Sequence, residues 1–254
     1  MKVFFEHSIF TKQILGGPSK YILDLAKNLN KLNVDARVFA PFHVNDFLES
    51  VQKENKFIYG KKVFLNEFIV NKNRPTLILE KLNFFLNKKN FENFNPDILH
   101  STYYNYDLYN KKVKLVVTVY DLIHEKLYKE YGLSRPRFSK EKILNIANQI
   151  ICISESTKRD LLEIYNIDEK KVHTIHLGIN KEDYFLDEKF NKQKSFVLYV
   201  GSRQRYKNFK LVIKMISKYP EINKDFDFVF FSSEKFGKYE KEILDYYKVN
   251  NQNL

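Results

Sequence analysis

This 254-residue chain has few cysteines and no long apolar run, and each of these absences excludes a class of protein or a structural feature. Cysteine occurs once, at Cys152, which excludes a disulfide within the chain. Because Cys152 lies in the apolar run IICIS, we expect a buried, inert thiol. No stretch approaches the roughly 20 apolar residues that a membrane-spanning helix needs, and MKVFFEHSIF leads into a strand pattern, not a signal peptide. We therefore expect a cytoplasmic protein.

Arginine-rich blocks and basic motifs interleaved with aromatic residues are also lacking, although the chain is strongly basic. Its formal net charge is +12 and its pI is about 9.4. Such charge suits nucleic acid, anionic lipid headgroups or a diphosphate substrate. Nucleic-acid modules usually concentrate that charge in one motif, so we expect no nucleic-acid partner. A diphosphate substrate and peripheral contact with the inner face of a membrane remain as predictions from charge.

The chain alternates short apolar runs with helical patterns, which predicts an α/β fold. Most of the runs are nearly continuous in apolar residues, as is typical of parallel strands covered on both faces. Ser154 has the side chain of a helix N-cap. We expect strands at 3–5, 35–40, 63–68, 97–101, 113–120, 150–154, 172–176, 196–201 and 226–231, and helices at 18–32, 75–90, 139–148, 155–165, 209–219 and 238–248.

A charged, aperiodic segment predicts a boundary between two Rossmann-like domains. We place a complete N-terminal domain at 1–185, a linker at 186–195 and the first part of a second domain at 196–254. Two strands and two helices, about 60 residues, are too few to close a three-layer α/β core. We therefore expect the chain to be a fragment, or its second domain to be completed by the first lobe or by another chain.

Ligands of open α/β sheets bind beyond the carboxyl ends of the strands, so residues that follow strands are the first candidates. Gly16 and Gly17 open the first helix, where backbone N–H groups can approach an anion, or where they simply form a tight turn. Asp121 and His124 follow a strong strand and could hold a sugar hydroxyl or move a proton, unless Asp121 only caps the next turn. His124 does not fit the HExxH zinc pattern, so we expect no metal.

The sharpest signal is a cationic turn between a strand and a helix in the second domain. It contains Arg203, Arg205, Lys207 and Asn208, and its cations could neutralise charge that develops on a diphosphate. The alternative is a solvated basic loop. His100, which ends another strand, is a candidate for the cleft, with a hydrogen-bonded structural histidine as its alternative.

Six segments in order resemble the retaining glycosyltransferases of family 4, including mannosyltransferase-like members that build bacterial polysaccharides. They are GGPSKYILDLAKNL, NPDILHS, KLVVTVYDLIHE, IICISESTKRDLLEIY, VHTIHLGIN and FVLYVGSRQRYKNF. The resemblance implies the GT-B fold and transfer of a sugar from a nucleotide diphosphate sugar to an acceptor hydroxyl with retention. It implies no cofactor or metal beyond the donor, and a glycan or lipid-linked acceptor.

The resemblance also implies roles for particular residues. Gly16 and Gly17 would lie near the donor phosphate and the acceptor, and Lys207 would hold the diphosphate together with an arginine. The family often has a histidine where this chain has Tyr120, so Tyr120 is expected at the cleft and His124 is the residue that could supply an imidazole there.

A glutamate pair that contacts the donor in the family is expected beyond residue 254, so we expect this chain alone to be weak or inactive. Two other functions remain open: a sugar-nucleotide epimerase or phosphorylase with the same fold, and a non-catalytic binding or scaffold protein.

Overall fold

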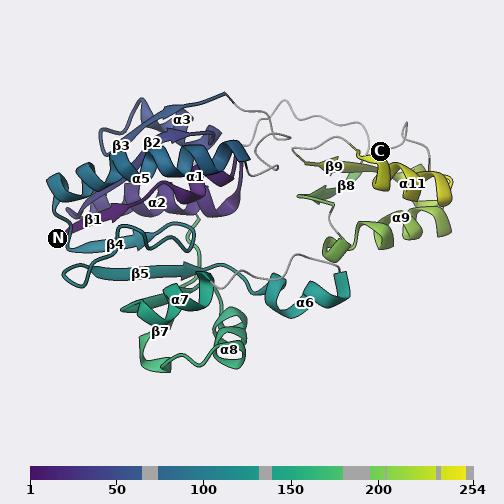
Figure 1. The fold of residues 1–254 in the computed structure, drawn as a ribbon. Helices are drawn as coiled ribbons and strands as arrows, with labels where there is room; N and C mark the ends of the chain where they lie inside the picture. The colour runs from purple at the N-terminus through teal and green to yellow at the C-terminus, as the bar shows by residue number, and fades with distance from the viewer. Residues whose placement is uncertain (65–73, 132–138, 180–194, 204, 233–235, 250–254) are drawn as a thin grey trace. The chain divides into compact units, whose positions relative to one another are not determined.

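A computed structural model describes most of the chain and divides it into two compact units (Figure 1). The first unit comprises residues 1–126 and 134–180, and the second comprises residues 127–133 and 181–254. The predicted linker at 186–195 lies almost entirely outside the described residues. These are residues 1–64, 74–131, 139–179, 195–203, 205–232 and 236–249.

The first unit is built on a seven-stranded sheet in which every neighbouring pair is parallel. The order of the strands is β3-β2-β1-β4-β5-β6-β7. Its strands are β1 (Lys2–Phe5), β2 (Asp35–His43), β3 (Ile58–Lys62), β4 (Ile98–Ser101), β5 (Lys114–Val119), β6 (Gln149–Cys152) and β7 (Val172–Thr174). The predicted α/β fold with a parallel sheet is confirmed.

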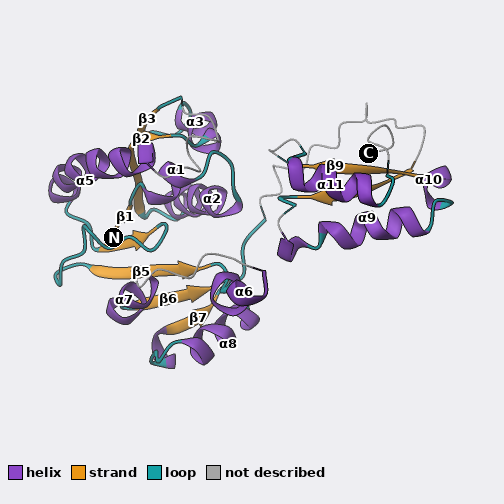
Figure 2. Cartoon of the chain, turned by 45° about the vertical axis from the view of Figure 1, so that its right-hand side comes forward, coloured by secondary structure: helices purple, strands orange, loops and turns teal. Residues whose placement is uncertain are grey.

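Helices cover both faces of this sheet. Phe4 belongs to one buried cluster together with side chains of α5 and α7, whereas Val3 and Phe5 belong to another with side chains of α1, α2 and α3. Successive residues of a strand point to opposite faces, so the two clusters lie on opposite sides. Figure 2 shows α5 and α2 on the two sides of β1.

In the described residues before 180 the helices are α1 (Ser8–Lys12), α2 (Gly17–Lys31), α3 (Asp46–Gln52), α5 (Arg74–Phe94), α6 (Ile123–Tyr131), α7 (Ser139–Ile146) and α8 (Glu155–Ile164), with a 3₁₀ turn η1 (Glu169–Lys171). The boundary between the two units falls within α6. Among the described residues, no helix is long and apolar enough to cross a membrane.

The ends of two predicted helices agree closely with the structure. Helix α2 begins at Gly17 with Pro18 in its first turn, where the missing N–H of proline costs nothing. Helix α8 is capped by Ser154, whose Oγ accepts a hydrogen bond from the Thr157 N–H at 3.1 Å. The predicted N-cap is therefore confirmed. Cys152 is fully buried, and burial raises the pKa of its thiol to about 11, as expected of an inert thiol.

One strand was predicted in the wrong place. Strand β3 covers Ile58–Lys62, whereas the prediction was 63–68; of that range only Val63 and Phe64 are described, and neither lies in a strand. The reason is position: β3 is the edge strand of the sheet, and its sequence IYGKK carries the glycine and lysines that edge strands tolerate. The apolar run VFLNEF resembled a strand more than IYGKK does. An edge strand is less buried than a central strand, so its residues need not be apolar.

The second unit has two parallel strands, β8 (Ser195–Val200) and β9 (Phe226–Phe231), in its described part. They are connected through a 3₁₀ turn η3 (Arg205–Lys207), helix α9 (Phe209–Lys218) and the short α10 (Ile222–Asp225), and helix α11 (Lys238–Tyr246) follows. A small core joins these elements, and it consists of Phe209, Ile213, Ile216, Phe228, Ile243 and Leu244.

Candidate functional site

The topology of the first unit marks one position at the edge of its sheet. From β1 the chain moves outward to β2 and β3, and then returns to place β4 on the other side of β1. Connections therefore leave β1 and β4 in opposite directions, which opens a crevice between their carboxyl ends. In open α/β sheets this switch point is where ligands bind. The residues just after Phe5 and Ser101 are thus the primary candidates for a site.

A buried carboxylate occupies this position. Glu6 directly follows β1 and is almost fully buried. Its Oε1 accepts hydrogen bonds from the backbone N–H and the hydroxyl of Thr102, at 2.8 and 2.6 Å, and its Oε2 accepts from the Ser8 N–H at 2.6 Å. The hydroxyl of Thr102 also accepts from the Ile9 N–H at 3.1 Å. Glu6 therefore fixes the loops that follow β1 and β4 against each other.

His7 lies beside this carboxylate and is also buried. The Asn87 amide lies 3.0 Å from Nδ1 of His7, so the neutral ring holds its proton on Nε2. Burial lowers the pKa of His7, and the negative charge of Glu6 opposes that shift. Its Nε2 has no hydrogen-bond partner among the described residues.

Four residues at this position were not predicted from the sequence: Glu6, His7, Ser8 and Thr102. The signal was nevertheless available, because Glu6 and Thr102 each directly follow a predicted strand. What the sequence does not show is that β1 and β4 are neighbours and flank the switch point.

The glycine loop lies on the same unit and opens α2. Gly16 is extended, and a Cβ there would meet the amide end of the Gln13 side chain, so that flexible side chain would have to move. A Cβ at Gly17 would meet no atom within 4 Å, so packing among the described residues does not require that glycine. Gly17 is exposed at the first turn of a 15-residue helix, where backbone N–H groups lack intrahelical acceptors. The loop is thus open to an anion.

Asp121 and His124 lie at the start of α6. The carboxylate of Asp121 accepts a hydrogen bond from the Ile123 N–H at 3.2 Å, so it caps this helix, as the alternative interpretation proposed. Both Asp121 and His124 are exposed. Their predicted roles, holding a sugar hydroxyl or moving a proton, stay predictions. Tyr120 packs edge-to-face on Tyr21 with ring centroids 5.8 Å apart. Burial raises the pKa of Tyr120, and its hydroxyl has no partner in the described part of the chain.

His100 lies within the sheet and has only 4% of its surface exposed. Its Nε2 lies 2.9 Å from the hydroxyl of Thr118 on the neighbouring strand, and its ring packs near Phe5. Burial lowers the pKa of His100 from 6.5 to about 4. This environment is that of a hydrogen-bonded structural histidine.

Replacing His100 by glutamine is expected to flatten the dependence of stability on pH. The unfolded chain binds a proton at His100 below pH 6.5, whereas the folded chain does so only near pH 4, so His100 costs stability as the pH falls through this range. From pH 7 to pH 5 the cost is about 2 kcal/mol. Urea unfolding at both pH values measures it. Equal losses in His100→Gln and the parent would contradict the assignment.

The cationic turn of the second unit follows β8 and precedes α9. Gly201 has a φ of 112°, which requires glycine, and Asn208 adopts the left-handed conformation just before the helix. The hydroxyl of Tyr199 lies 3.2 Å from the carbonyl oxygens of both Ser202 and Lys207, which fixes the turn to its strand. The side chain of Lys207 is exposed, with its Nζ 5.4 Å from the ring centroid of Tyr206.

The two arginines of this turn differ in what the structure describes. The guanidinium of Arg203 is buried, lies 4.6 Å from the ring centroid of Phe236 and has its Nε 3.9 Å from a carboxylate oxygen of Glu240. Arg203 thus contributes to the packing of the second unit. The side chain of Arg205 lies outside the described residues.

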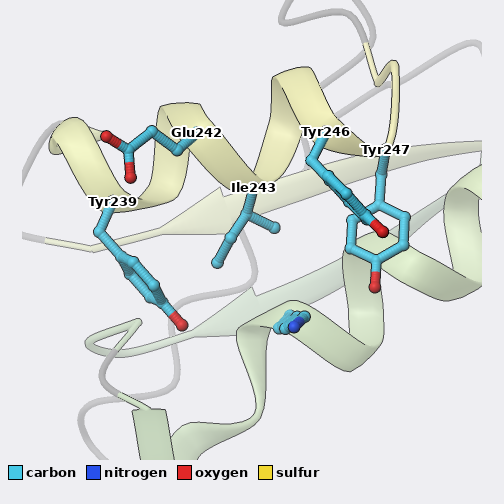
Figure 3. A pocket seen from close by; sticks show the side chains of 6 residues that line it. Tyr239, Glu242, Ile243, Tyr246 and Tyr247 are labelled. Atoms are coloured by element: carbon cyan, nitrogen blue, oxygen red, sulfur yellow. The ribbon is translucent and has the colours of Figure 1, made fainter.

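A hollow of about 230 Å³ lies between α9 and α11 (Figure 3). Figure 3 shows Tyr239 and Ile243 of α11, and Tyr247 at the end of that helix, extending into it. Glu242, Tyr246 and Lys210 complete its lining. None of the predicted site residues lines this hollow.

Comparison with known proteins identifies the family. The profile described as Glycosyltransferase Family 4 matches residues 15–183, more than half of the chain. The chain belongs to glycosyltransferase family 4. The matched segment begins just before the glycine loop and covers most of the seven-stranded sheet. A search of curated proteins found no match.

Solved structures share the fold at low sequence identity. A glycosyltransferase from Rickettsia africae ESF-5 is 19% identical, with a TM-score of 0.58 over 98% of this chain and 66% of its own. TarM of S. aureus, in complex with Fondaparinux, alpha-GlcNAc-glycerol and UDP, is 10% identical, with a TM-score of 0.68 over 99% and 76%. UDP-GlcNAc 2-epimerase from Neisseria meningitidis, bound to UDP-GlcNAc, is 17% identical, with a TM-score of 0.58 over 96% and 69%. The chain therefore has the α/β fold of GT-B glycosyltransferases and spans about two thirds to three quarters of these proteins.

Proposed function

We propose that this family 4 member transfers a sugar from a nucleotide diphosphate sugar to an acceptor hydroxyl, with retention of the anomeric configuration. The observation that carries the proposal is the cationic turn at Lys207, at the carboxyl end of β8 and the N-terminus of α9. This is the position in an α/β unit where a diphosphate gains both side-chain cations and helix N–H groups. The TarM and epimerase structures contain UDP or UDP-GlcNAc, which supports a nucleotide-sugar donor.

In the proposed reaction, negative charge grows on the diphosphate as the glycosidic bond breaks. Lys207 stabilises that charge more than it stabilises the intact donor, which lowers the barrier. Arg205 is the second proposed cation, because Arg203 is already packed against Phe236. Asn208 sets the direction of the turn through its left-handed backbone.

The acceptor side of the reaction is proposed for the first unit. Gly17, open to a ligand at the start of α2, and the switch point at Glu6 and Thr102 are the positions that support it. Asp121 and His124 remain candidates for hydrogen bonds to a sugar hydroxyl. The proposed acceptor is a glycan or a lipid-linked sugar in polysaccharide or glycoconjugate assembly, in the cytoplasm, and no metal or further cofactor is part of the proposal.

The test is to incubate the protein, together with any sequence that extends beyond residue 254, with a panel of nucleotide sugars and simple sugar acceptors, and to follow the products by NMR. Transfer requires release of nucleoside diphosphate and a glycoside whose anomeric configuration equals that of the donor. Inversion at the anomeric carbon would overturn the retaining mechanism.

The second candidate is a sugar-nucleotide epimerase, favoured by the structural match to the Neisseria enzyme. An epimerase changes the sugar of the donor in the absence of any acceptor, and the same NMR experiment detects this. Binding of a nucleotide sugar without any conversion would instead favour a non-catalytic binding protein.

A further inference from the structure

The hollow between α9 and α11 in the second unit is formed mainly by one side of α11. Four lining side chains of that helix follow one another at helical spacing and so share one side of it; they are Tyr239, Glu242, Ile243 and Tyr246. Ile243 is buried in the core of the unit, whereas Tyr239 and Tyr246 are 44% and 78% exposed. The helix therefore holds two tyrosine rings at the surface with a buried isoleucine between them (Figure 3).

The aromatic part of the lining is fixed before any ligand arrives. Tyr246 and Tyr247 pack edge-to-face with their ring centroids 4.9 Å apart, and Tyr247 also packs against the core of the second unit. A tyrosine ring is placed by only two side-chain torsions, so covering it with a ligand costs little conformational entropy. The hollow thus presents a preformed aromatic surface.

Two side chains of opposite charge complete the lining. Lys210, in the first turn of α9, can donate hydrogen bonds, and the carboxylate of Glu242 can accept them. An oxygen of Glu242 also lies 3.9 Å from Nζ of Lys238, but both side chains are largely exposed, and such a pair is weak. The charges of Lys210 and Glu242 cancel, so the lining itself selects neither an anion nor a cation.

A sugar ring matches this combination of groups. Its C–H groups form an apolar face that packs on an aromatic ring, and its hydroxyl groups both donate to a carboxylate and accept from an ammonium group. A purely apolar partner would bury Lys210 and Glu242 without hydrogen bonds, which is costly. A phosphate would be repelled by Glu242.

The size of the hollow limits the ligand further. Its volume of about 230 Å³ equals the share of roughly seven or eight water molecules in the liquid. A hexose fits in this space, because its covalently bonded atoms pack more closely than water molecules do, whereas a whole nucleotide sugar does not.

We propose that the hollow between α9 and α11 binds one neutral hexose unit of a glycan. Tyr239 and Tyr246 pack on the faces of the sugar, and Glu242 and Lys210 bond to its hydroxyl groups. None of the residues assigned to sugar transfer lines the hollow. The inference goes beyond the proposed transfer and does not depend on it.

The test is saturation-transfer difference NMR on the full protein, with the methyl glycosides of glucose, galactose and mannose as probes. Saturation is expected to pass from the protein to the C–H protons of at least one of these sugars at millimolar concentration. Tyr246→Ala is expected to weaken this binding about ten-fold, because it removes the more exposed ring. Glu242→Gln is expected to weaken it about three-fold, since a charged acceptor forms the stronger hydrogen bond.

Tyr219→Ala provides the matched control. Tyr219 is 42% exposed at the end of α9 in the same unit, and it does not line the hollow. This variant is expected to bind the sugar as the parent does. Lys207→Ala, which is expected to lower sugar transfer, is likewise expected to leave this binding unchanged, so the two proposals fail separately. Thermal unfolding checks that each variant is folded.

Three results would overturn the proposal. The first is no saturation transfer to any of the three methyl glycosides. The second is binding that Tyr246→Ala leaves unchanged, or that Tyr219→Ala weakens equally, since the sugar then binds elsewhere. The third is tighter binding of cyclohexanol, which has a six-membered ring but a single hydroxyl group, since the hollow would then be an apolar contact surface.

Discussion

Replacing Lys207 by alanine is expected to lower the rate of sugar transfer by about a hundred-fold. The side chain of Lys207 is exposed on a turn that the hydroxyl of Tyr199 holds to β8. Within the described part of the chain, Lys207 forms no salt bridge, so its charge is available to a ligand. A cation that acts mainly on the leaving diphosphate affects turnover more than donor binding. Steady-state kinetics should therefore show a large fall in kcat and a small change in KM.

Lys214 provides the matched control for this prediction. It is exposed on α9, which begins just after Lys207, and Lys214→Ala removes the same charge from the same unit. Its transfer rate is expected to remain near that of the parent. If Lys207→Ala retained the parent rate, or if Lys214→Ala fell equally, the assignment of the diphosphate to this turn would be wrong.

Arg203 is expected to behave differently from Lys207. Its buried guanidinium lies over Phe236 and near Glu240, so its loss removes packing and leaves a carboxylate in a less favourable environment. A fall in activity of an Arg203 variant therefore cannot be assigned to diphosphate binding unless its thermal unfolding is measured as well.

Replacing Glu6 by alanine is expected to destabilise the first unit by about 3 kcal/mol or more. The substitution leaves the N–H groups of Ser8 and Thr102 buried without their acceptor, and it removes the hydrogen bond from the Thr102 hydroxyl. Each buried donor that loses its acceptor carries the cost of its own desolvation. Urea unfolding at neutral pH measures the change in the free energy of unfolding.

Two further variants serve as comparisons for Glu6→Ala. Glu6→Gln keeps one carbonyl-type oxygen but replaces the other with an NH₂ group that cannot accept, so we expect an intermediate loss. Glu54→Ala removes an exposed glutamate and is expected to change stability by less than about 0.5 kcal/mol. A loss in Glu6→Ala no larger than that of Glu54→Ala would show that the network does not hold the β1 and β4 loops together.

Part of the candidate site could be predicted from the sequence because it follows from local order. Gly17 before Pro18 and the cations around Lys207 are adjacent in the chain and lie between a strand and a helix. The environments of Glu6 and Arg203 could not be predicted in this way. Glu6 meets Thr102, and Arg203 meets Phe236, only when distant segments pack.

The sequence by itself determined the alternation of strands and helices, the parallel sheet and the cap at Ser154. These depend on apolar runs, helical periodicity and side chains within a few residues of each other. Only the tertiary structure decided that β1 and β4 are neighbours, that β3 is an edge strand, and that α5 turns its asparagines inward and Phe85 outward. The physical reason is that α5 has apolar residues on both sides, so local pattern leaves its buried face open. The backbone of β2, which Asn83 and Asn87 satisfy, selects that face.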